Sequence, residues 1–244
     1  MQNLSTMTVR EIALEMPQTT RVFEQFKIDY CCGGRKPIAE ACERAGVDSK
    51  DVIEQLEALF TSGVPADDWV GNASLHELIS HILDKHHVFT KNELRSLAPL
   101  MDKVARVHGD NHSELIELKA AFEELSDDLF PHMMKEEEVL FPFVERLVRC
   151  KEKGLPTPMP PFGTVRNPIR MMMSEHDMAG DILRKMRSLS KDYTPPPDAC
   201  PSFTGLYYRL AELERDLHQH IHLENNVLFP RAVELEDAAL AAEV

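Results

Sequence analysis

Apolar positions recur at alternating steps of three and four residues through most of the chain after residue 74. Two segments show this spacing most clearly, and their inward positions are Leu125, Leu129, His132, Glu136, Val139 and Phe143 in one and Leu210, Leu213, Leu217, His220, Glu224 and Val227 in the other. Such spacing is typical of amphipathic helices that bury one face in a core. Together with capping and breaking residues, it predicts long helices over about residues 74–106, 112–151, 166–190 and 202–237. Strand-like alternation is not evident, so the predicted fold class is all-α, with a four-helix bundle as its main part.

The residues before the bundle predict a small helical domain. Its expected helices run from Thr8 to about Met16, over residues 18–27, from Pro37 to Ala45 and from Asp48 to about Leu59. Gly and Pro cluster with capping residues after these helices, which is the composition of a linker. We therefore divide the chain into a helical domain over residues 1–62, a linker over 63–73 and a bundle over 74–244. Four short helices bury little apolar surface, so we expect this domain to lean on the bundle or on a partner, as in a homodimer.

A His–Glu pair occurs twice inside the apolar stripes. His132 and Glu136 form the first pair, and His220 and Glu224 form the second one 88 residues later. Residues four apart in a helix project from the same face, so each pair presents an imidazole and a carboxylate to the core. Each pair is followed by an apolar run and a proline, which favours the end of a helix interior at that point.

A further histidine precedes each pair at nearly the same distance. His87 lies 45 residues before His132, and His176 lies 44 residues before His220. Four helices that carry His, His-x3-Glu, His and His-x3-Glu predict a quasi-twofold bundle with a metal site inside it. Two metal ions are the natural occupants, because facing helices of a bundle commonly supply such sites.

The energetics of burial favour a metal over a structural role for these side chains. A lone histidine on an apolar face is usually a satisfied core residue, but a buried unpaired carboxylate costs at least several kcal/mol. The nearby basic residues Lys135 and Arg231 fall off the inner stripe. Glu136 and Glu224 therefore need cations or must take up protons. Imidazole and carboxylate ligands without thiolates favour iron or manganese over a structural zinc site.

Composition and charge exclude several other classes of protein. The formal net charge of −14 and the pI near 5.2 argue against a nucleic-acid-binding protein. No apolar run approaches the roughly 20 residues of a membrane span, and the first ten residues lack the pattern of a secretory signal. The five cysteines are odd in number and unevenly spread, so we expect reduced thiols and a cytoplasmic location.

Several motifs together resemble one family. They are Asp29-Tyr-Cys-Cys-Gly-Gly34, His132-Met-Met-Lys-Glu-Glu137, Ser174-Glu-His-Asp177, Thr194-Pro-Pro-Pro197 and His222-Leu-Glu-Asn-Asn-Val-Leu-Phe-Pro-Arg231. The second domain resembles a hemerythrin-type bundle, and the whole chain resembles the iron–sulfur cluster repair di-iron proteins. The resemblance implies two non-haem iron ions, bridged by both glutamates and held by His87, His132, Glu136, His176, His220 and Glu224. It also implies a role under nitrosative or oxidative stress, with damaged iron–sulfur proteins as partners.

Two features of the bundle qualify this resemblance. The apolar stripe of the first long helix places His86, and not His87, at its centre, whereas the family pattern selects His87; both remain candidates. Oxygen-carrying hemerythrins have a second histidine one turn after the third-helix ligand, and here that position is Gly180. Open coordination positions would admit nitric oxide or dioxygen, or permit release of iron. Glu137 and Glu138 are expected to be solvated.

The adjacent cysteines Cys31 and Cys32 have two interpretations. Neighbouring cysteines form a disulfide only with strain, so the pair can be two half-buried thiols beside the Gly33-Gly34 turn. Alternatively, it is a mobile thiol pair that relays iron, nitric oxide or electrons, and Cys42 could join it. The favoured function is cluster repair by donation of iron. The alternatives are a sensor that binds nitric oxide or dioxygen, and a reductase of nitric oxide or nitrite at the two irons.

Overall fold

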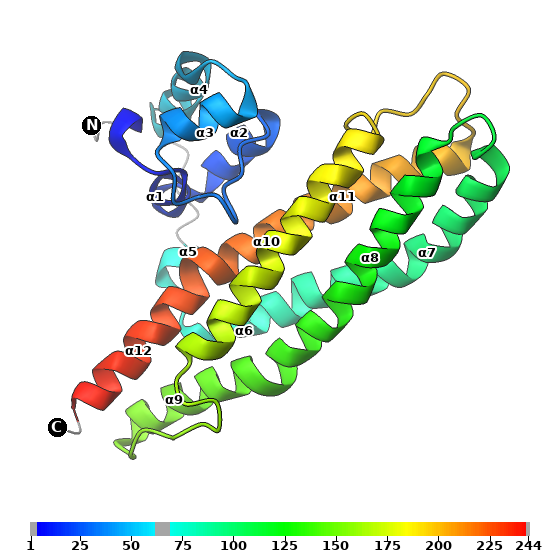
Figure 1. Cartoon of the computed structure of the whole chain (residues 1–244). Coiled ribbons are helices and arrows are strands. Elements are labelled where there is room, and N and C mark those ends of the chain that lie inside the picture. Colours follow the sequence, from blue (N-terminus) through cyan, green and yellow to red (C-terminus); the bar gives the residue numbers. More distant parts are fainter. Residues whose placement is uncertain (1–3, 62–68, 243–244) are drawn as a thin grey trace.

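Helices are the only extended regular elements in the part of the chain that the computed structural model describes, residues 4–61 and 69–242. The predicted all-α fold class is confirmed. None of the helices in these two ranges is both long and apolar enough to span a bilayer. Figure 1 shows the two parts of the molecule: a compact group of short helices at the N-terminus and an elongated bundle of longer helices.

Each rod of the bundle corresponds to one of the four predicted long helices. The helices that build the rods are α6 (Leu75–His81) with α7 (Val88–His108), α8 (Glu114–Lys135) with α9 (Phe141–Lys153), α10 (Arg166–Leu189), and α11 (Pro201–Leu223) with α12 (Phe229–Ala241). The rods pack around two apolar clusters, one lined by α7, α8, α10 and α11 and the other by α6, α9, α10 and α12. The predicted histidines and glutamates lie at the level between these clusters.

Three of the rods contain a π-helical turn at this level. These turns are Ile82–His87, Glu136–Leu140 and Glu224–Leu228. The expectation that Pro142 and Pro230 end their helices is wrong, because each rod continues through the π turn into α9 or α12. Each proline occupies the first turn of the following helix, where a missing N–H group costs little.

The N-terminal helices form a module with its own core. Their bounds are α1 (Val9–Glu15), α2 (Thr20–Gln25), α3 (Ile38–Ala45) and α4 (Ser49–Thr61), with 3₁₀ turns at Leu4–Thr6 and Pro17–Thr19. Thr8 and Glu11 form the reciprocal capping box that starts α1. Gly46 ends α3 at φ 70°, in the left-handed region that glycine adopts without strain. Apolar side chains from all four helices fill this core.

The module packs against the bundle of its own chain, on the side of α11 and the π turn Glu224–Leu228. His218 on α11 lies 2.9 Å from a carboxylate oxygen of Glu24 on α2. Asn226 donates a hydrogen bond of 3.1 Å to the backbone carbonyl of Tyr30 and accepts one of 3.0 Å at its own carbonyl from Arg10. Of the predicted linker, residues 69–72 form the short helix α5 (Trp69–Asn72), and residues 63–68 lie outside the described ranges. The boundaries of the two domains and the homodimer stay predictions.

Candidate metal centre

Six side chains converge between the two apolar clusters of the bundle. They fall into two groups of four potential ligands, namely His87, Glu136, His220 and Glu224, and His132, Glu136, His176 and Glu224. All six residues are buried, and both glutamates have no exposed surface. The two groups share their glutamates, so each carboxylate lies between two clusters of imidazole nitrogens. The structure therefore brings together all six residues of the predicted ligand set.

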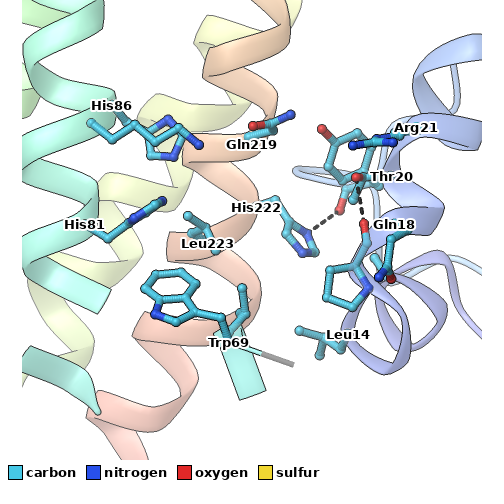
Figure 2. A pocket seen from close by; sticks show the side chains of 15 residues that line it. Leu14, Gln18, Thr20, Arg21, Trp69, His81, His86, Gln219, His222 and Leu223 are labelled. Carbon is cyan, nitrogen blue, oxygen red and sulfur yellow. Dashed lines mark hydrogen bonds between the residues drawn. The ribbon is translucent and has the colours of Figure 1, made fainter. Parts of the chain in front are cut away.

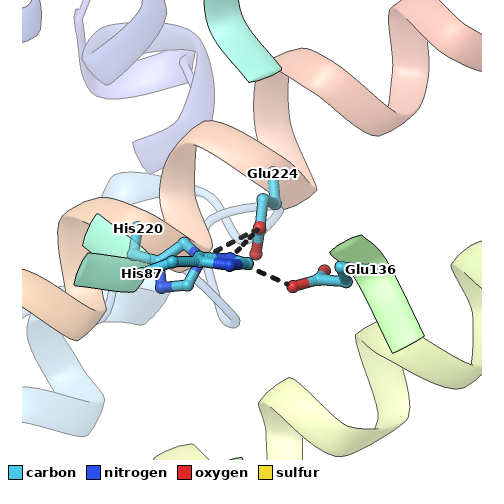
Figure 3. Close-up of side chains that lie close together, drawn as sticks. All are labelled: His87, Glu136, His220 and Glu224. Carbon is cyan, nitrogen blue, oxygen red and sulfur yellow. Dashed lines mark hydrogen bonds and ion pairs between the residues drawn. The ribbon is translucent and has the colours of Figure 1, made fainter. Parts of the chain in front are cut away.

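The first group gathers around the Nε2 atoms of His87 and His220, which lie 3.2 Å apart. Figure 3 shows both rings beside the carboxylate of Glu224, with Glu136 approaching from the opposite rod. His220 Nε2 lies 2.9 Å from Oε1 of Glu224, and His87 Nε2 lies 3.5 Å from Oε2 of Glu136. Nitrogen and oxygen atoms at such separations can share one cation.

The second group repeats this arrangement on the other side of the glutamates. The Nε2 atoms of His132 and His176 lie 3.1 Å apart. His132 Nε2 is 3.4 Å from Oε2 of Glu136, and His176 Nε2 is 3.2 Å from Oε2 of Glu224. The quasi-twofold relation expected from the repeated motif is thus present in the positions of the atoms.

The electrostatics of the centre call for cations. Burial, reinforced by the charge of Glu224, raises the pKa of Glu136 well above its usual range. Neither carboxylate oxygen of Glu136 has a hydrogen-bond partner among the described residues. Burial and the neighbouring imidazoles lower the pKa of His87 and of His132 to about 4, which keeps both rings neutral and able to ligate at neutral pH. The neutral imidazoles of His87 and His132 beside the buried, unpartnered carboxylate of Glu136 are suited to binding a cation.

Outer hydrogen bonds hold the imidazoles with Nε2 facing inward. Nδ1 of His87 lies 2.6 Å from Oε1 of Glu137, which also accepts a hydrogen bond from Lys91 at 2.5 Å. Glu137 is only partly solvated: its side chain is 29% exposed, and its carboxylate lies against the outer nitrogen of His87. Glu138 is exposed, as expected. A carboxylate on the outer nitrogen of an imidazole sets its tautomer and raises its basicity as a metal ligand.

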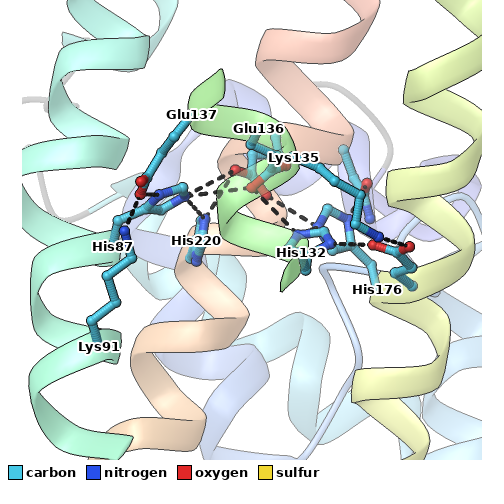
Figure 4. Close-up of polar contacts among 11 residues, drawn as sticks. His87, Lys91, His132, Lys135, Glu136, Glu137, His176 and His220 are labelled. Atoms are coloured by element: carbon cyan, nitrogen blue, oxygen red, sulfur yellow. Dashed lines mark hydrogen bonds and ion pairs between the residues drawn. The ribbon is translucent and has the colours of Figure 1, made fainter. Parts of the chain in front are cut away.

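The second group has the same kind of support. Nδ1 of His132 lies 2.8 Å from Oε2 of Glu175, and Lys135 donates a hydrogen bond to the other oxygen of that carboxylate. His176 uses its Nδ1 differently, at 2.9 Å from the amide oxygen of Asn225. Figure 4 shows these chains on both sides of Glu136. Each half of the centre thus has one Lys–Glu–His chain.

His86 is buried but lies outside both groups. Its Nδ1 lies 3.0 Å from Oδ1 of Asp216, and its ring stacks on that of His220 at 5.6 Å between centroids. Figure 2 shows His86 on the wall of a cavity between the bundle and the N-terminal module, next to His81. The reason is the π turn Ile82–His87, which inserts one residue into the helical register and moves the inward position from His86 to His87.

The cysteine pair lies against the backbone of the third rod. Sγ of Cys32 is 3.5 Å from the backbone carbonyl oxygen of His176, and the two sulfur atoms of the pair, both free thiols, are 3.6 Å apart. A Cβ atom on Gly180 would stand 3.6 Å from Sγ of Cys32, an ordinary contact, so only a side chain larger than that of alanine would crowd this thiol. Cys31, Cys32 and Asp29 form a third group of potential ligands, whereas Cys42 is buried in the core of the module.

The thiol of Cys31 is protonated at neutral pH. The hydrogen bond with Cys32, followed by burial, raises the pKa of Cys31 well above its usual range. The carboxylate of Asp29 accepts hydrogen bonds from the backbone N–H groups of both cysteines, at 3.1 Å and 2.9 Å, and holds the turn in place. The pair therefore lies in a turn held by hydrogen bonds, beside the candidate ligand His176.

Comparison with known proteins gives the same two-part organisation. Residues 5–60 match the model of a domain described as Domain of Unknown function (DUF542), and residues 78–232 match that of the Hemerythrin HHE cation binding domain. The iron-sulfur cluster repair protein YtfE of Escherichia coli O1:K1 is 38% identical over 223 residues, which cover 91% of this chain and 94% of the relative. A protein of the same name from Dickeya chrysanthemi is 37% identical, over 91% of this chain and 95% of the relative.

Proposed function

Because this chain belongs to the family of iron–sulfur cluster repair proteins with a hemerythrin HHE domain, we propose that it restores iron–sulfur clusters damaged by nitrosative or oxidative stress. The resemblance read from the motifs is confirmed by relatives that match nearly the whole chain. Its targets are then damaged iron–sulfur proteins.

The arrangement of the ligands supports a centre of two iron ions. One ion would be held by His87 and His220 and the other by His132 and His176, with Glu136 and Glu224 shared between them. The observation that carries this proposal is that both glutamates belong to both groups of ligands. Hard carboxylate oxygens with imidazole nitrogens suit iron. When bound, the ions supply open coordination positions and a source of ferrous iron.

Donation of iron fits a centre that is incompletely enclosed by protein ligands. Each ion would receive two imidazoles and two shared carboxylates, and no histidine stands at Gly180 to close a further position. Iron is the cargo in this proposal. The Glu175 and Glu137 carboxylates lie on the outer nitrogens of two ligands and can accept or return a proton there as ions leave or enter.

We infer that Cys31 and Cys32 take up the departing iron. Cys32 lies directly on the backbone of the His176 turn, and Asp29 adds an oxygen ligand next to both thiols. Because the Cys31 thiol is protonated in this arrangement, binding of iron must release that proton. The thiols and Asp29 thus form a second, weaker iron-binding site between the buried centre and a target protein.

The test is an anaerobic repair assay with a hydratase whose cluster has been damaged by nitric oxide. The iron-loaded protein is compared with a Cys31→Ala/Cys32→Ala variant. Cys150→Ala is the matched control, because Cys150 lies on α9 and belongs to none of the groups of potential ligands. We expect recovery of hydratase activity with the wild type and the control, and loss of recovery with the double variant. Equal recovery in all three would keep repair but remove the thiols from it.

The same assay separates the alternatives. A sensor of nitric oxide or dioxygen would retain its iron and change its shape or its affinity for a partner. A reductase would consume nitric oxide or nitrite repeatedly when supplied with an electron donor. If the iron-loaded wild type fails to repair the hydratase and shows one of these behaviours, the corresponding alternative would replace the proposed function.

A further inference from the structure

An arginine-lined cavity of about 380 Å³ lies between the N-terminal module and the bundle. Four arginines reach its wall, Arg10 and Arg35 from the module and Arg166 and Arg170 from α10. Its other lining residues are apolar apart from Asn225, and none is acidic. This concentration of positive charge is unusual in a chain with a net charge of −14.

Most of this positive charge is uncompensated. Arg166 pairs with Asp237 at 2.5 Å, but within the described residues Arg10, Arg35 and Arg170 form no ion pair. Burial and the neighbouring charge of Arg35 lower the pKa of Arg10. The carboxylates that attract Arg10 most, those of Glu11 and Glu234, stay beyond ion-pair distance. Like charges gathered across a domain boundary repel each other; solvent screens the exposed Arg35 and Arg170 in part, and an anion between them would remove the remaining repulsion.

One donor in the cavity wall is also unsatisfied. Arg10 donates from Nη2 to the carbonyl oxygen of Asn226 at 3.0 Å, while its buried Nε–H group has no partner among the described residues. A buried guanidinium donor without an acceptor costs about 1–3 kcal/mol. Arg170 donates one long hydrogen bond of 3.5 Å from Nη2 to Oδ1 of Asn167, which leaves its other donors available. An oxyanion would satisfy Nε–H of Arg10 together with these donors and those of Arg35, in the geometry that guanidinium groups offer to carboxylates and phosphates.

The floor of the cavity is apolar and touches the metal centre. Ile169, Met173 and Val233 line it, together with Phe229, whose ring stacks on His176 at 6.0 Å and 3° between planes. Asn225 faces the cavity and also bonds to Nδ1 of His176. A bare inorganic ion would leave most of this space and its apolar floor unused, whereas a compact dicarboxylate would place its carbon chain there.

We propose that this cavity binds a small dianion, with a compact dicarboxylate as the preferred ligand, which bridges Arg10 and Arg35 of the module to Arg170 of the bundle. The bound dianion replaces the missing counter-charge across the boundary and fixes the module over the His176 side of the centre. The ligand contacts Asn225 and Phe229, so its presence is transmitted to a metal ligand without coordination to the metal.

The experiment is titration calorimetry of the iron-loaded full chain at low ionic strength, with succinate as the probe and inorganic phosphate as the comparison. Succinate chelates iron weakly, so the centre stays loaded. The variant Arg35→Gln/Arg170→Gln removes two exposed cations without touching the core, and Arg44→Gln/Arg95→Gln is the matched control with the same change of charge elsewhere. Circular dichroism verifies that each variant is folded.

We expect saturable binding of succinate that is weakened at least about tenfold in Arg35→Gln/Arg170→Gln and unchanged in the control, since one charge-assisted hydrogen bond contributes about that factor. The unfolding midpoint of the wild type should rise with succinate. Tighter binding of phosphate, lost in the same variant, would retain the anion site and assign it to phosphate-type ligands. Absence of binding by both ions, or equal weakening in the control variant, would overturn the proposal.

Discussion

Replacement of Glu137 by Gln should loosen one of the two ions selectively. The Glu137 carboxylate lies 2.6 Å from Nδ1 of His87, and Lys91 contacts the same oxygen. Gln keeps a hydrogen-bond acceptor on the imidazole but removes the negative charge that would strengthen His87 as a ligand. Loss of a carboxylate on the outer nitrogen of a metal-bound histidine typically weakens affinity by 10–100-fold.

The geometry places the effect near the lower end of that range. The Glu137 side chain is 29% exposed, so water screens part of its charge, and the acceptor atom is retained. We expect a loss of about 1.5 kcal/mol, or roughly tenfold in affinity, at the site of His87 and His220. The site of His132 and His176 keeps its own support from Glu175, so its affinity should change little.

The assay is an anaerobic competition in which a ferrous chelator withdraws iron from the loaded protein. Glu138→Gln is the matched control, because Glu138 is adjacent, carries the same charge and is exposed. The Glu137→Gln variant should lose its first ion at roughly tenfold lower chelator concentration, with wild-type behaviour in the control. Identical curves for both variants and the wild type would refute the role assigned to Glu137.

Three other changes test the rest of the account. Glu136→Ala and Glu224→Ala should each leave at most a single bound ion, because each removes a ligand of both groups; iron analysis showing two ions per chain in these variants would sink the ligand assignment. Gly180→Leu should displace Cys32 from His176 and raise the rate at which Cys32 is alkylated. Gly180→Ala should not, because its Cβ atom would lie 3.6 Å from Sγ of Cys32, an ordinary contact. Burial opposes protonation of His218, but the carboxylate of Glu24 outweighs this effect and raises the pKa of His218 in the folded protein. The contact between His218 and Glu24 should therefore stabilise the docked module fully below the ordinary histidine pKa, and this stabilisation should be lost as pH rises through the raised pKa. The difference in unfolding midpoint between the wild type and His218→Gln should shrink as pH rises through the raised pKa of His218. A difference that does not depend on pH would contradict a stabilising ion pair.

The bundle and the repeated His–Glu pairs were predictable because helical periodicity extends over many turns. Glu136 and Glu224 occupy inward positions of that pattern, and a buried carboxylate has few alternatives to a cation. Two independent copies of the same pair made the interpretation specific. The placement of His132 and His220 followed from the same periodicity, since both precede the π turns of their rods.

The π turns were beyond the reach of the periodicity argument. A regular helix through Ile79 and Ile82 points His86 inward, and only the extra residue of the turn Ile82–His87 delivers His87 to the centre. The same effect hid Glu137, which a regular helix would direct to solvent. The prolines at 142 and 230 directly follow two of the π turns, but Pro99 lies inside α7 without such a turn and the turn Ile82–His87 contains no proline. Proline alone therefore does not locate the π turns.

The docking of the N-terminal module rests on individual polar contacts that no sequence pattern encodes. Asn226 bonds to the Tyr30 carbonyl, and Arg10 reaches back to the Asn226 carbonyl over more than two hundred residues of chain. The Cys-Cys motif could be recognised, but not its position on the His176 turn.

Transfer of labelled iron tests the central claim most directly. The protein is loaded with a Mössbauer-active iron isotope and incubated without oxygen with a nitric-oxide-damaged hydratase containing unlabelled iron. If the centre donates iron, the label leaves the chain and appears in the spectrum of the restored cluster as hydratase activity returns. A restored cluster without label, while the label remains bound to this protein, would contradict donation of iron from the centre.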